Sequence, residues 1–407
     1  MKNLLKKCYR LLNNEKLVFA IFILYYIGRT GGNTSFVTQW PATDKGFQVL
    51  RMLGFFFFGI ETVKLAIGYL KEKHTAMQML LMLGFVLLLG ALGMNFIIQG
   101  AYTFLTDIMM AFVMSHIALK KTISVRMIVL FATCMIVPLL SNFGLLENLI
   151  TTRGDTMRYA LGFDYTTRIS GIYGFATLYY CYLRKFKLTW RDIFMMVFSS
   201  LLIDFLTDTR TYFFLELGFG VIAILVKLHV VQKFKKAYLV IESLFVNLFP
   251  IATIATLFIT VAYGQGGIFI KLDEILTHRL AQVYADLVNY GIHPFGVSFA
   301  QYGNGGAHEA ITSVFGSNYI DSGFLQLLIV RGLIPFAFIV LFTAIALQQF
   351  YKHHMHQELF VALIITLLST FSGGLMSNES VLFIFMFYGL RLLYTSSSRK
   401  EILHENL

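Results

Sequence analysis

The sequence predicts an all-α polytopic membrane protein, and its composition and hydropathy are the basis of that prediction. Of its 407 residues, 57% are hydrophobic and only 14% are charged, whereas a soluble domain carries about 25% charged residues. Mean hydropathy is +0.70. Apolar runs of about 17 to 25 residues, long enough to cross a bilayer, recur along the whole length. We therefore predict that residues 1–407 form a single integral membrane domain.

Hydropathy predicts about twelve membrane-spanning helices. Their expected ranges are 17–28, 47–70, 76–98, 101–119, 127–144, 169–183, 193–207, 211–230, 238–263, 318–350, 358–374 and 379–394. No small-residue cleavage site follows the first span, so it is interpreted as a retained helix and not as a signal peptide. Arg331-Gly332 and Pro335 predict that span 318–350 is interrupted and forms two helical pieces.

The short loops orient the chain, because Lys and Arg concentrate on the cytoplasmic side of membrane proteins. Most of the 33 Lys and Arg residues fall on the side of the N-terminus, which predicts that both termini are cytoplasmic. The predicted outer side holds only Arg29, Lys45, Arg153, Arg158, Arg168, Arg210, Lys271 and Arg279. This asymmetry accounts for most of the net charge of +11. Because no aromatic–basic interleaving is present, we expect no nucleic-acid partner.

Two long polar loops lie on the predicted outer side. The longest, 264–318, interrupts an otherwise apolar chain, and long ordered loops tend to be functional rather than connective. Apolar residues at helical spacing between Ile268 and Tyr290 predict a helix along the outer membrane surface. The second loop, 145–168, carries several charged residues. We expect the large loop to contain short interfacial helices and to hold part of an active site, together with charged side chains directed at it.

Arginines on the outer side are candidates for binding phosphate, since the planar guanidinium matches phosphate oxygens and stays charged. Arg210 lies in a tight turn, where a structural pair with Asp208 or Asp204 is the alternative. For Arg279, on the predicted surface helix, the alternative is a solvated face or a lipid-headgroup contact. For Arg168 it is a simple anchor at the membrane interface.

A second group of candidates could handle protons. Asp321 begins the return into the membrane next to Tyr319, and it could act as a general base. The alternative for Asp321 is an N-cap of span 318–350, because Asp is among the best N-caps. His278 could move a proton, although a lone interfacial histidine is more often polar surface. No HExxH, GxSxG or Asp-x-Asp motif occurs in the chain, and no metal site is expected.

Four local patterns carry a resemblance to a known family. They are Thr207-Asp208-Thr209-Arg210-Thr211, Arg168-Ile169-Ser170-Gly171, His278-Arg279 followed by 289–296 (NYGIHPFG), and 318–325 (NYIDSGFL) ending at 332–334 (GLI). With the predicted topology, they make the chain resemble the Wzy-type polysaccharide polymerases and the related O-antigen ligases. Those families belong to the lipid-dependent GT-C glycosyltransferases. Ligases carry a histidine where this chain has Asp321, and this departure favours polymerisation.

The resemblance implies a GT-C-like fold and a polymerase of lipid-linked repeat units for capsule, exopolysaccharide or O-antigen, in the bacterial cytoplasmic membrane. The donor would be a growing glycan on undecaprenyl pyrophosphate, and the acceptor a lipid-linked repeat unit. Catalytic roles fall to Asp321, Arg210 and Arg279. Roles in binding pyrophosphate or glycan fall to Arg168, His278, Tyr319 and Arg158. The resemblance implies no metal or cofactor. Membrane lipid is an expected partner, and a chain-length regulator protein is a further candidate partner.

A transporter of lipid-linked oligosaccharides, or flippase, is the competing class, and a glycan ligase is the other alternative. A chain with many spans and both ends inside suits a transporter equally well. Against a transporter stand the lack of an internal repeat and the shortage of charges in the middle of the spans, where Glu61, Lys64, Glu216 and Glu379 are the main ones. The concentration of polar sequence in one outer loop favours chemistry at the membrane surface.

Overall fold

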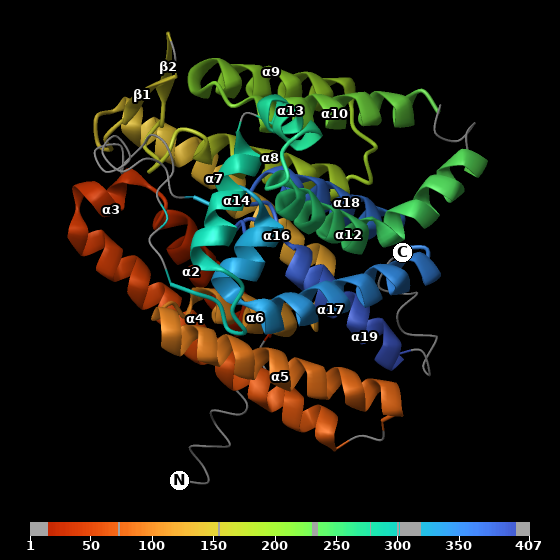
Figure 1. Cartoon of the computed structure of the whole chain (residues 1–407). Helices are drawn as coiled ribbons and strands as arrows, with labels where there is room; N and C mark the ends of the chain where they lie inside the picture. The colour runs from red at the N-terminus through yellow and green to blue at the C-terminus, as the bar shows by residue number, and fades with distance from the viewer. Residues whose placement is uncertain are drawn as a thin grey trace. The chain divides into compact units, whose positions relative to one another are not determined.

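Helices make up most of the chain in the computed structural model of the protein (Figure 1). The structure describes residues 15–71, 74–153, 155–229, 235–276, 278–298, 301 and 319–395. Every predicted span overlaps a helix, or consecutive helical pieces in the case of 318–350, although the ends differ by up to eight residues for spans such as 127–144. The helices are α2 (Glu15–Gly31), α4 (Pro41–Leu70), α5 (Ala76–Gln99), α6 (Thr103–Met114), α7 (Leu119–Asn142), α8 (Arg168–Leu183), α9 (Trp190–Thr207), α10 (Arg210–Lys227), α12 (Lys235–Tyr263), α16 (Gly323–Gln326), α17 (Leu333–Lys352), α18 (His356–Phe371) and α19 (Leu382–Thr395).

Within the described part of the chain, five helices are long and apolar enough to cross a membrane, judged by length and composition. They are Pro41–Leu70, Ala76–Gln99, Leu119–Asn142, Phe245–Tyr263 and Leu333–Lys352. Thr103–Met114, His356–Thr370 and Leu382–Leu393 are shorter apolar helices. The chain is thus a mostly helical, multi-pass membrane protein. The full set of spans and their orientation stay predictions.

One face of α4 shows why this helix suits lipid. Val49, Met52, Phe56, Ile60 and Val63 recur every three or four residues and are all exposed, Phe56 by 61%. In water, an apolar stripe of this length would promote association. In a bilayer the same stripe faces hydrocarbon at no cost, and the helix buries its opposite face, including Phe58, within the protein.

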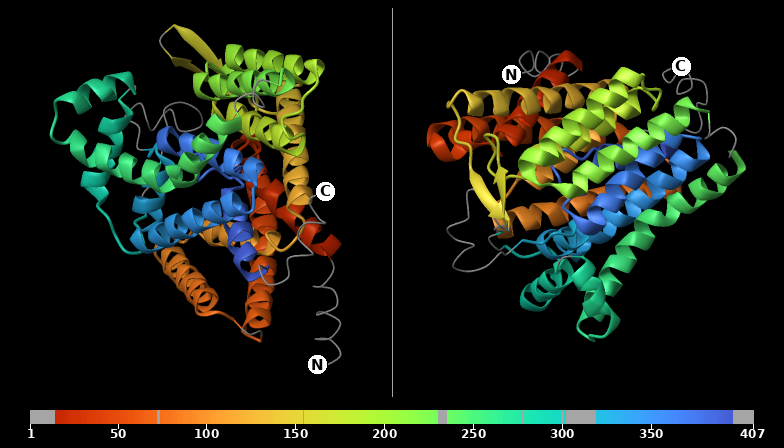
Figure 2. Two further views of the ribbon diagram at one scale, coloured as in Figure 1. Left: turned by 90° about the vertical axis from the view of Figure 1, so that its right-hand side faces the viewer. Right: turned by 90° about the horizontal axis from the view of Figure 1, so that it is seen from above.

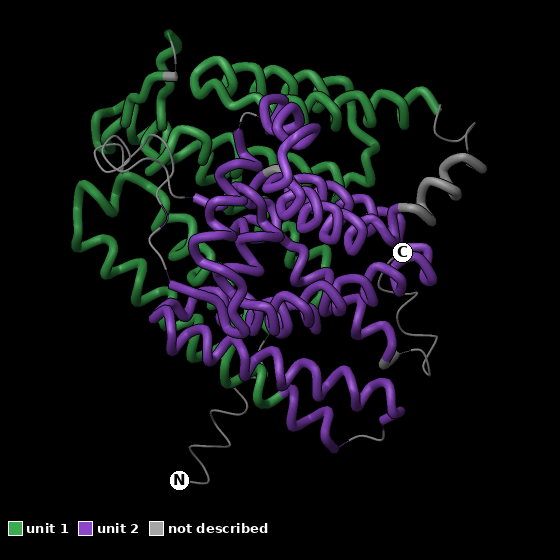
Figure 3. The backbone as a smooth tube through the Cα atoms, in the orientation of Figure 1, with its two compact units in different colours: residues 1–64, 117–235, 303–316 green, residues 65–116, 236–302, 317–407 purple. Residues whose placement is uncertain are grey.

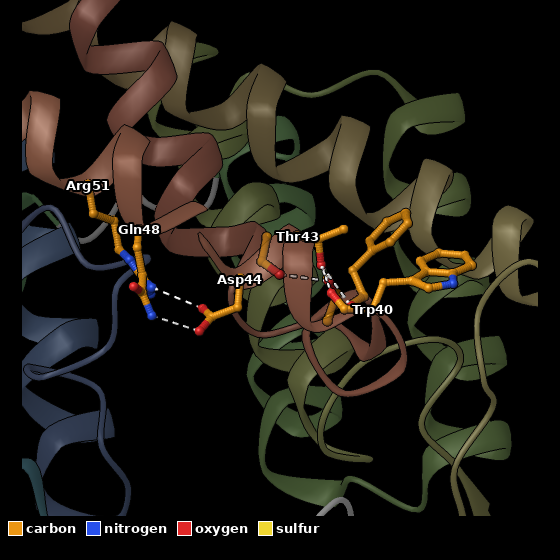
Figure 4. Close-up of polar contacts among 8 residues, drawn as sticks. Trp40, Thr43, Asp44, Gln48 and Arg51 are labelled. Atoms are coloured by element: carbon orange, nitrogen blue, oxygen red, sulfur yellow. Dashed lines mark hydrogen bonds and ion pairs between the residues drawn. The ribbon is translucent and has the colours of Figure 1, made fainter. Parts of the chain in front are cut away.

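The start of α4 lies six residues before the predicted span, and its polar contacts explain why (Figure 4). The short helix α3 (Ser35–Gln39) ends at Trp40, and Pro41 opens α4, a position that proline favours. The Thr43 hydroxyl donates to the carbonyl of Trp40 at 2.7 Å. Asp44, the next residue, accepts from Gln48 at 2.7 Å and pairs with Arg51 at 3.2 Å. Arg51, predicted to lie inside a span, therefore has its counter-charge on its own helix.

The contacts within the chain divide it into two compact units (Figure 3). Unit 1 holds residues 1–64, 117–235 and 303–316, and unit 2 holds 65–116, 236–302 and 317–407. In unit 1, α8 packs between α7 and the α9–α10 pair, and it is buried along nearly its whole length. In unit 2, α17 packs against α19 so closely that a Cβ at Gly389 would meet Ala346. The single domain expected from the sequence stays a prediction.

The loop 145–168 in unit 1 contains a β-hairpin that an all-α prediction lacks. Strand β1 (Ile150–Arg153) pairs antiparallel with β2 (Thr156–Tyr159), with Thr151 opposite Arg158. The Thr and Tyr side chains of this stretch favour extended backbone. Strand β2 packs against α9, beside which the hairpin lies in Figure 2.

The large loop contains two short helices, as expected, but the continuous helix that the apolar spacing predicted over 268–290 is wrong. Helix α13 (Ile268–Ile275) ends before His278, whose backbone adopts the left-handed conformation with φ +63°. Helix α14 (Arg279–Tyr290) begins directly after it. The Asp273 carboxylate accepts from the backbone N–H of Ala281 at 3.0 Å, and it thereby caps α14 in place of His278. The break fixes Arg279 as the first residue of α14.

The predicted interruption of span 318–350 is confirmed. Helix α16 continues into a π-helical turn, η1 (Leu327–Arg331), which ends at Gly332 before α17 begins. Segment 293–297 lies against this turn. Leu333 N–H donates to the His293 carbonyl at 2.9 Å, and Val297 N–H donates to that of Ile329 at 3.1 Å. We call these contacts between 293–297 and 329–334 the clamp. The motif residues His293 to Gly296 therefore have a structural role.

Two side chains from α5 complete the clamp within unit 2. The Asn95 amide donates to the carbonyls of Phe295 at 2.6 Å and Val330 at 2.9 Å. The Gln99 amide donates to the carbonyl of Val297 at 3.1 Å, and its oxygen accepts from Arg331 at 3.0 Å. These amides satisfy carbonyls that the π-helical turn and the irregular segment leave unpaired, as buried backbone groups require.

Replacing Gly296 by alanine is expected to disrupt the clamp. Gly296 has φ +79°, and a Cβ there would overlap the carbonyl oxygen of Val330. We expect a loss of stability above about 3 kcal/mol, since steric overlap adds to the backbone strain of a left-handed alanine. Gly100→Ala is the matched control: Gly100 has φ +68° with open space around it, so strain alone should cost about 1–2 kcal/mol. Detergent-phase thermal melts of equal size in the two variants would contradict the clamp.

Candidate functional site

The centre of the candidate site is an ion pair in unit 2 between Arg279 and Asp321. The Arg279 Nε lies 3.4 Å from an Asp321 carboxylate oxygen, and each side chain is about one-third exposed. Helix α14 supplies Arg279 from its first turn, and the segment just before α16 supplies Asp321. A partly exposed pair of this kind contributes little to stability. It does leave both groups accessible to a ligand.

Asp321 is not the N-cap of the following helix, which was the alternative to a chemical role. The cap position of α16 is Ser322, and its side chain makes no capping hydrogen bond. Instead the Gly323 N–H donates to the Ser372 carbonyl at 2.9 Å, and the Gln326 N–H donates to the Ser322 carbonyl at 2.8 Å. The Ser372 carbonyl thus takes up the first N–H of α16, and the Gln326 bond is the first ordinary bond within the helix. The Asp321 carboxylate stays directed to Arg279.

Helix α14 carries a further carboxylate, Asp286, on the same face as Arg279. Arg279, Gln282 and Asp286 are spaced by three and four residues, so they lie on the same side of the helix. The Gln282 amide donates to the Tyr319 carbonyl at 2.6 Å, which holds this face against the segment that carries Asp321. Burial, together with the nearby Asp321 charge, raises the pKa of Asp286 to about 6. Arg279, Asp321 and Asp286 form what we call the outer cluster.

Sequence reasoning missed Asp286, although a signal was present. An acidic residue seven positions after Arg279 lies two helical turns away on the same face. That face also carries the buried Val283, so Asp286 falls on a side of the helix that packs inward. Treating the helix as an amphipathic surface element drew attention to its apolar residues alone.

Two other predicted residues of unit 2 lie beside the outer cluster. Tyr319 contributes its backbone carbonyl to Gln282. His278 pairs with Asp273 at 3.2 Å, and the His278 side chain is 76% exposed. The backbone of His278 also donates to the Asp273 carbonyl at 2.9 Å. His278 thus helps to fix the start of α14, and Tyr319 helps to fix its packing. Their contacts with substrate stay predictions.

In unit 1, Arg158 ties the hairpin to a helix end. Its side chain is buried, and its Nε donates to the Thr207 carbonyl at 2.8 Å, at the C-terminus of α9. A cation is favoured at this end of a helix by the macrodipole and the unpaired carbonyls. The Thr207 hydroxyl is also hydrogen-bonded to Ser170 on α8 at 3.1 Å. These contacts give Arg158 a structural role in joining β2, α9 and α8.

The other two predicted arginines of unit 1 each pair with a neighbouring aspartate. Arg168, the first residue of α8, lies 3.3 Å from Asp164. Arg210, the first residue of α10, lies 3.5 Å from Asp208, which confirms the pairing considered as an alternative for it. The Arg210 side chain is nevertheless 72% exposed. It can therefore contact a ligand while Asp208 orients it.

Part of the large loop 264–318 cannot be compared with the sequence prediction. Residues 299–300 and 302–318, including Asn318 of the motif 318–325, lie outside the described residues. Among the residues the structure covers, no group of three or more His, Cys, Asp or Glu side chains is arranged to hold a metal ion.

Comparison with known proteins returned no relative: no family model, no curated protein and no solved structure matches the chain. The functional interpretation therefore depends on the sequence motifs and on the geometry of the outer cluster.

Proposed function

We propose that the protein is a polysaccharide polymerase that transfers a growing glycan from undecaprenyl pyrophosphate to a lipid-linked repeat unit. The observation that supports this proposal is the pairing of Arg279 with Asp321. These residues come from two of the motifs that resemble the Wzy-type polymerases, and they are far apart in sequence. Their pairing puts a cation suited to phosphate beside a carboxylate suited to proton transfer, on the predicted outer side of the membrane.

The proposed reaction is a direct displacement. The acceptor hydroxyl attacks the anomeric carbon of the donor, the new glycosidic bond forms, and the bond to the pyrophosphate oxygen breaks with its electron pair. Arg279 stabilises the negative charge that develops on the leaving pyrophosphate, where preorganised charge is most effective. Asp321 accepts the proton that the acceptor hydroxyl loses. Displacement of this kind inverts the anomeric centre and needs no nucleotide.

The ion pair must open for this chemistry, and its exposure makes that inexpensive. Both side chains are about one-third accessible, so pyrophosphate can replace Asp321 as the partner of Arg279 at little electrostatic cost. Binding of the donor would then release the Asp321 carboxylate toward the acceptor. The predicted roles of Arg210 and Arg168 in binding pyrophosphate stay predictions from the motifs.

The test is polymerisation by the purified protein in detergent or nanodiscs, supplied with a lipid-linked repeat unit. We expect a ladder of longer lipid-linked products on a gel, formed equally in EDTA, because arginines supply the positive charge that a divalent ion supplies in other enzymes. A flippase would instead move the substrate across vesicles without lengthening it, and a ligase would need a different acceptor. Substrate translocation without any ladder would refute the polymerase, and loss of the ladder in EDTA would refute metal independence.

A further inference from the structure

We propose that a small pocket in unit 1 binds a sodium ion, with Glu216 as the main ligand. The site goes beyond the proposed function and does not depend on it. The pocket lies among α8, α9 and α10, which pack against one another (Figure 1). Six of the residues that line it carry a side-chain oxygen: Ser170, Ser200, Asp204, Thr209, Tyr212 and Glu216.

Glu216 is a buried carboxylate whose charge needs a partner. It lies on α10, inside a predicted span, and is only 2% exposed. The Ser200 hydroxyl of α9 approaches the carboxyl group, and Oε1 lies 3.5 Å from the place where a Cβ on Gly174 of α8 would stand. The other oxygen, Oε2, has no hydrogen-bond partner among the described residues. Burial of an uncompensated carboxylate is costly, and within a membrane such a group usually marks a functional site.

Glu61 shows the contrast in the same unit. It is also buried inside a predicted span, but its carboxylate lies 3.2 Å from the Lys64 ammonium group, one turn further along α4. The counter-charge of Glu61 therefore comes from its own helix. The described residues that line the pocket of Glu216 include no lysine, arginine or histidine, and they add a second carboxylate, Asp204.

Asp204 and two hydroxyls bring further oxygens to the pocket. Asp204 lies one turn after Ser200 on α9, so the two share a face of that helix. Its Oδ1 atom is buried without a hydrogen-bond partner in the described part of the chain. The Thr209 hydroxyl donates to the Thr207 carbonyl at 3.3 Å, and the Ser170 hydroxyl is hydrogen-bonded to that of Thr207 at 3.1 Å. Both hydroxyls keep a lone pair that can contact a cation.

The size and the chemistry of the pocket decide which ligand it takes. Its walls enclose about 150 Å³, including the part open to solvent, whereas sites for small organic molecules hold about 300–1,000 Å³. Two carboxylates repel an anion, and oxygen ligands suit hard cations. The space is too narrow for a water molecule, which disfavours Mg²⁺ because that ion keeps several waters. A dehydrated sodium ion is smaller than water, and potassium is about as large as water.

The pocket adjoins the turn that carries Arg210. Thr209 lines the pocket and directly precedes Arg210, the first residue of α10. Arg210 acts electrostatically on Asp204, but its side chain is 72% exposed and does not line the pocket. Its charge therefore leaves Glu216 uncompensated. A sodium ion between Asp204 and Glu216 joins α9 to α10 and fixes the turn between them.

Thermal melts of the purified protein in detergent test the site without any substrate. Sodium, potassium and choline chloride are compared at equal ionic strength. We expect the melting temperature of the wild type to rise by about 2–4 °C when sodium reaches roughly ten times its dissociation constant, and to stay unchanged in potassium. Glu216→Gln removes the charge with little change in shape and should abolish the response to sodium. Glu61→Gln, the matched control, should keep the wild-type response, because Glu61 has its counter-charge in Lys64.

Binding of radioactive sodium, measured by equilibrium dialysis, tests the site directly. We expect the wild type to bind one ion per chain, displaced by unlabelled sodium but not by the same concentration of potassium or calcium. Glu216→Gln and the half-buried Asp204→Asn should each weaken binding by roughly tenfold or more, since affinity follows the charge of the ligands. Asp204→Asn also serves as the test variant if Glu216→Gln does not fold. Absence of saturable binding to the wild type, wild-type binding in both variants, or displacement by calcium would each overturn the proposal.

Discussion

Asp321→Asn is expected to lower the rate of polymerisation by roughly 10²–10⁴-fold, the range that general-base catalysis contributes. Asparagine has nearly the shape of aspartate but cannot accept the proton of the acceptor hydroxyl. The structure sharpens this expectation, because Ser322 and not Asp321 occupies the cap position of α16. The rate of ladder formation by the purified variant, with saturating lipid-linked substrate, is the measurement.

Stability and donor binding should stay close to wild type in Asp321→Asn. The pair with Arg279 is partly exposed, and such pairs contribute about 0–1 kcal/mol. Arg279 itself is unchanged, so binding of the lipid pyrophosphate, measured with a fluorescent donor, should persist. A folded Asp321→Asn protein that elongates chains near the wild-type rate would remove Asp321 from the mechanism.

Arg279→Ala is expected to abolish or nearly abolish polymer without loss of expression. The variant loses the charge that stabilises the leaving pyrophosphate, and removal of one such group typically costs about 10²–10³ in rate. Arg279→Lys should also lose most activity, because a point charge cannot make the two parallel contacts of a guanidinium. The motif resemblance predicts the same result for Arg210→Ala. Donor binding and ladder formation, measured side by side, should fall together.

Lys271→Ala provides the control for Arg279→Ala. Lys271 is an exposed cation on α13, in the same predicted outer loop. Its loss removes one positive charge from the region, so general electrostatic attraction of an anionic lipid falls by a similar amount in both variants. If Lys271→Ala loses as much activity as Arg279→Ala, the effect of Arg279 is one of overall charge and not of position. Wild-type polymer in Arg279→Ala would refute the site.

Hydropathy predicted the approximate positions of the helices because membrane helices are long and apolar. Both properties can be recognised from a run of consecutive residues, without knowledge of distant contacts. The β-hairpin at Ile150–Tyr159 and the early start of α4 were missed for a common reason. Both involve polar residues: Arg158 of the hairpin donates to the Thr207 carbonyl, and Asp44 at the start of α4 pairs with Arg51. A hydropathy window reports only the mean over its residues, so a polar stretch of this kind is predicted to be a loop.

The candidate site was predicted in its motif residues but not in its packing. Arg279 and Asp321 were recognised individually, and the structure adds that they contact each other. Their pairing depends on the break at His278, which sets where α14 begins. It depends also on Gln282, which holds Tyr319. Sequence periodicity ran through the break as if the helix were continuous, since one residue in the left-handed conformation leaves the apolar pattern on both sides intact.

The clamp has a consequence for how this protein can vary in evolution. Gly296 has φ +79° and lies against the Val330 carbonyl, so no residue with a Cβ fits there without moving the backbone. Asn95 donates to carbonyls on both sides of the clamp, and a side chain without an amide donor would leave them unpaired. In homologous chains we therefore expect Gly296 and Asn95 to be kept, while exposed positions such as Val288 on α14 are free to change.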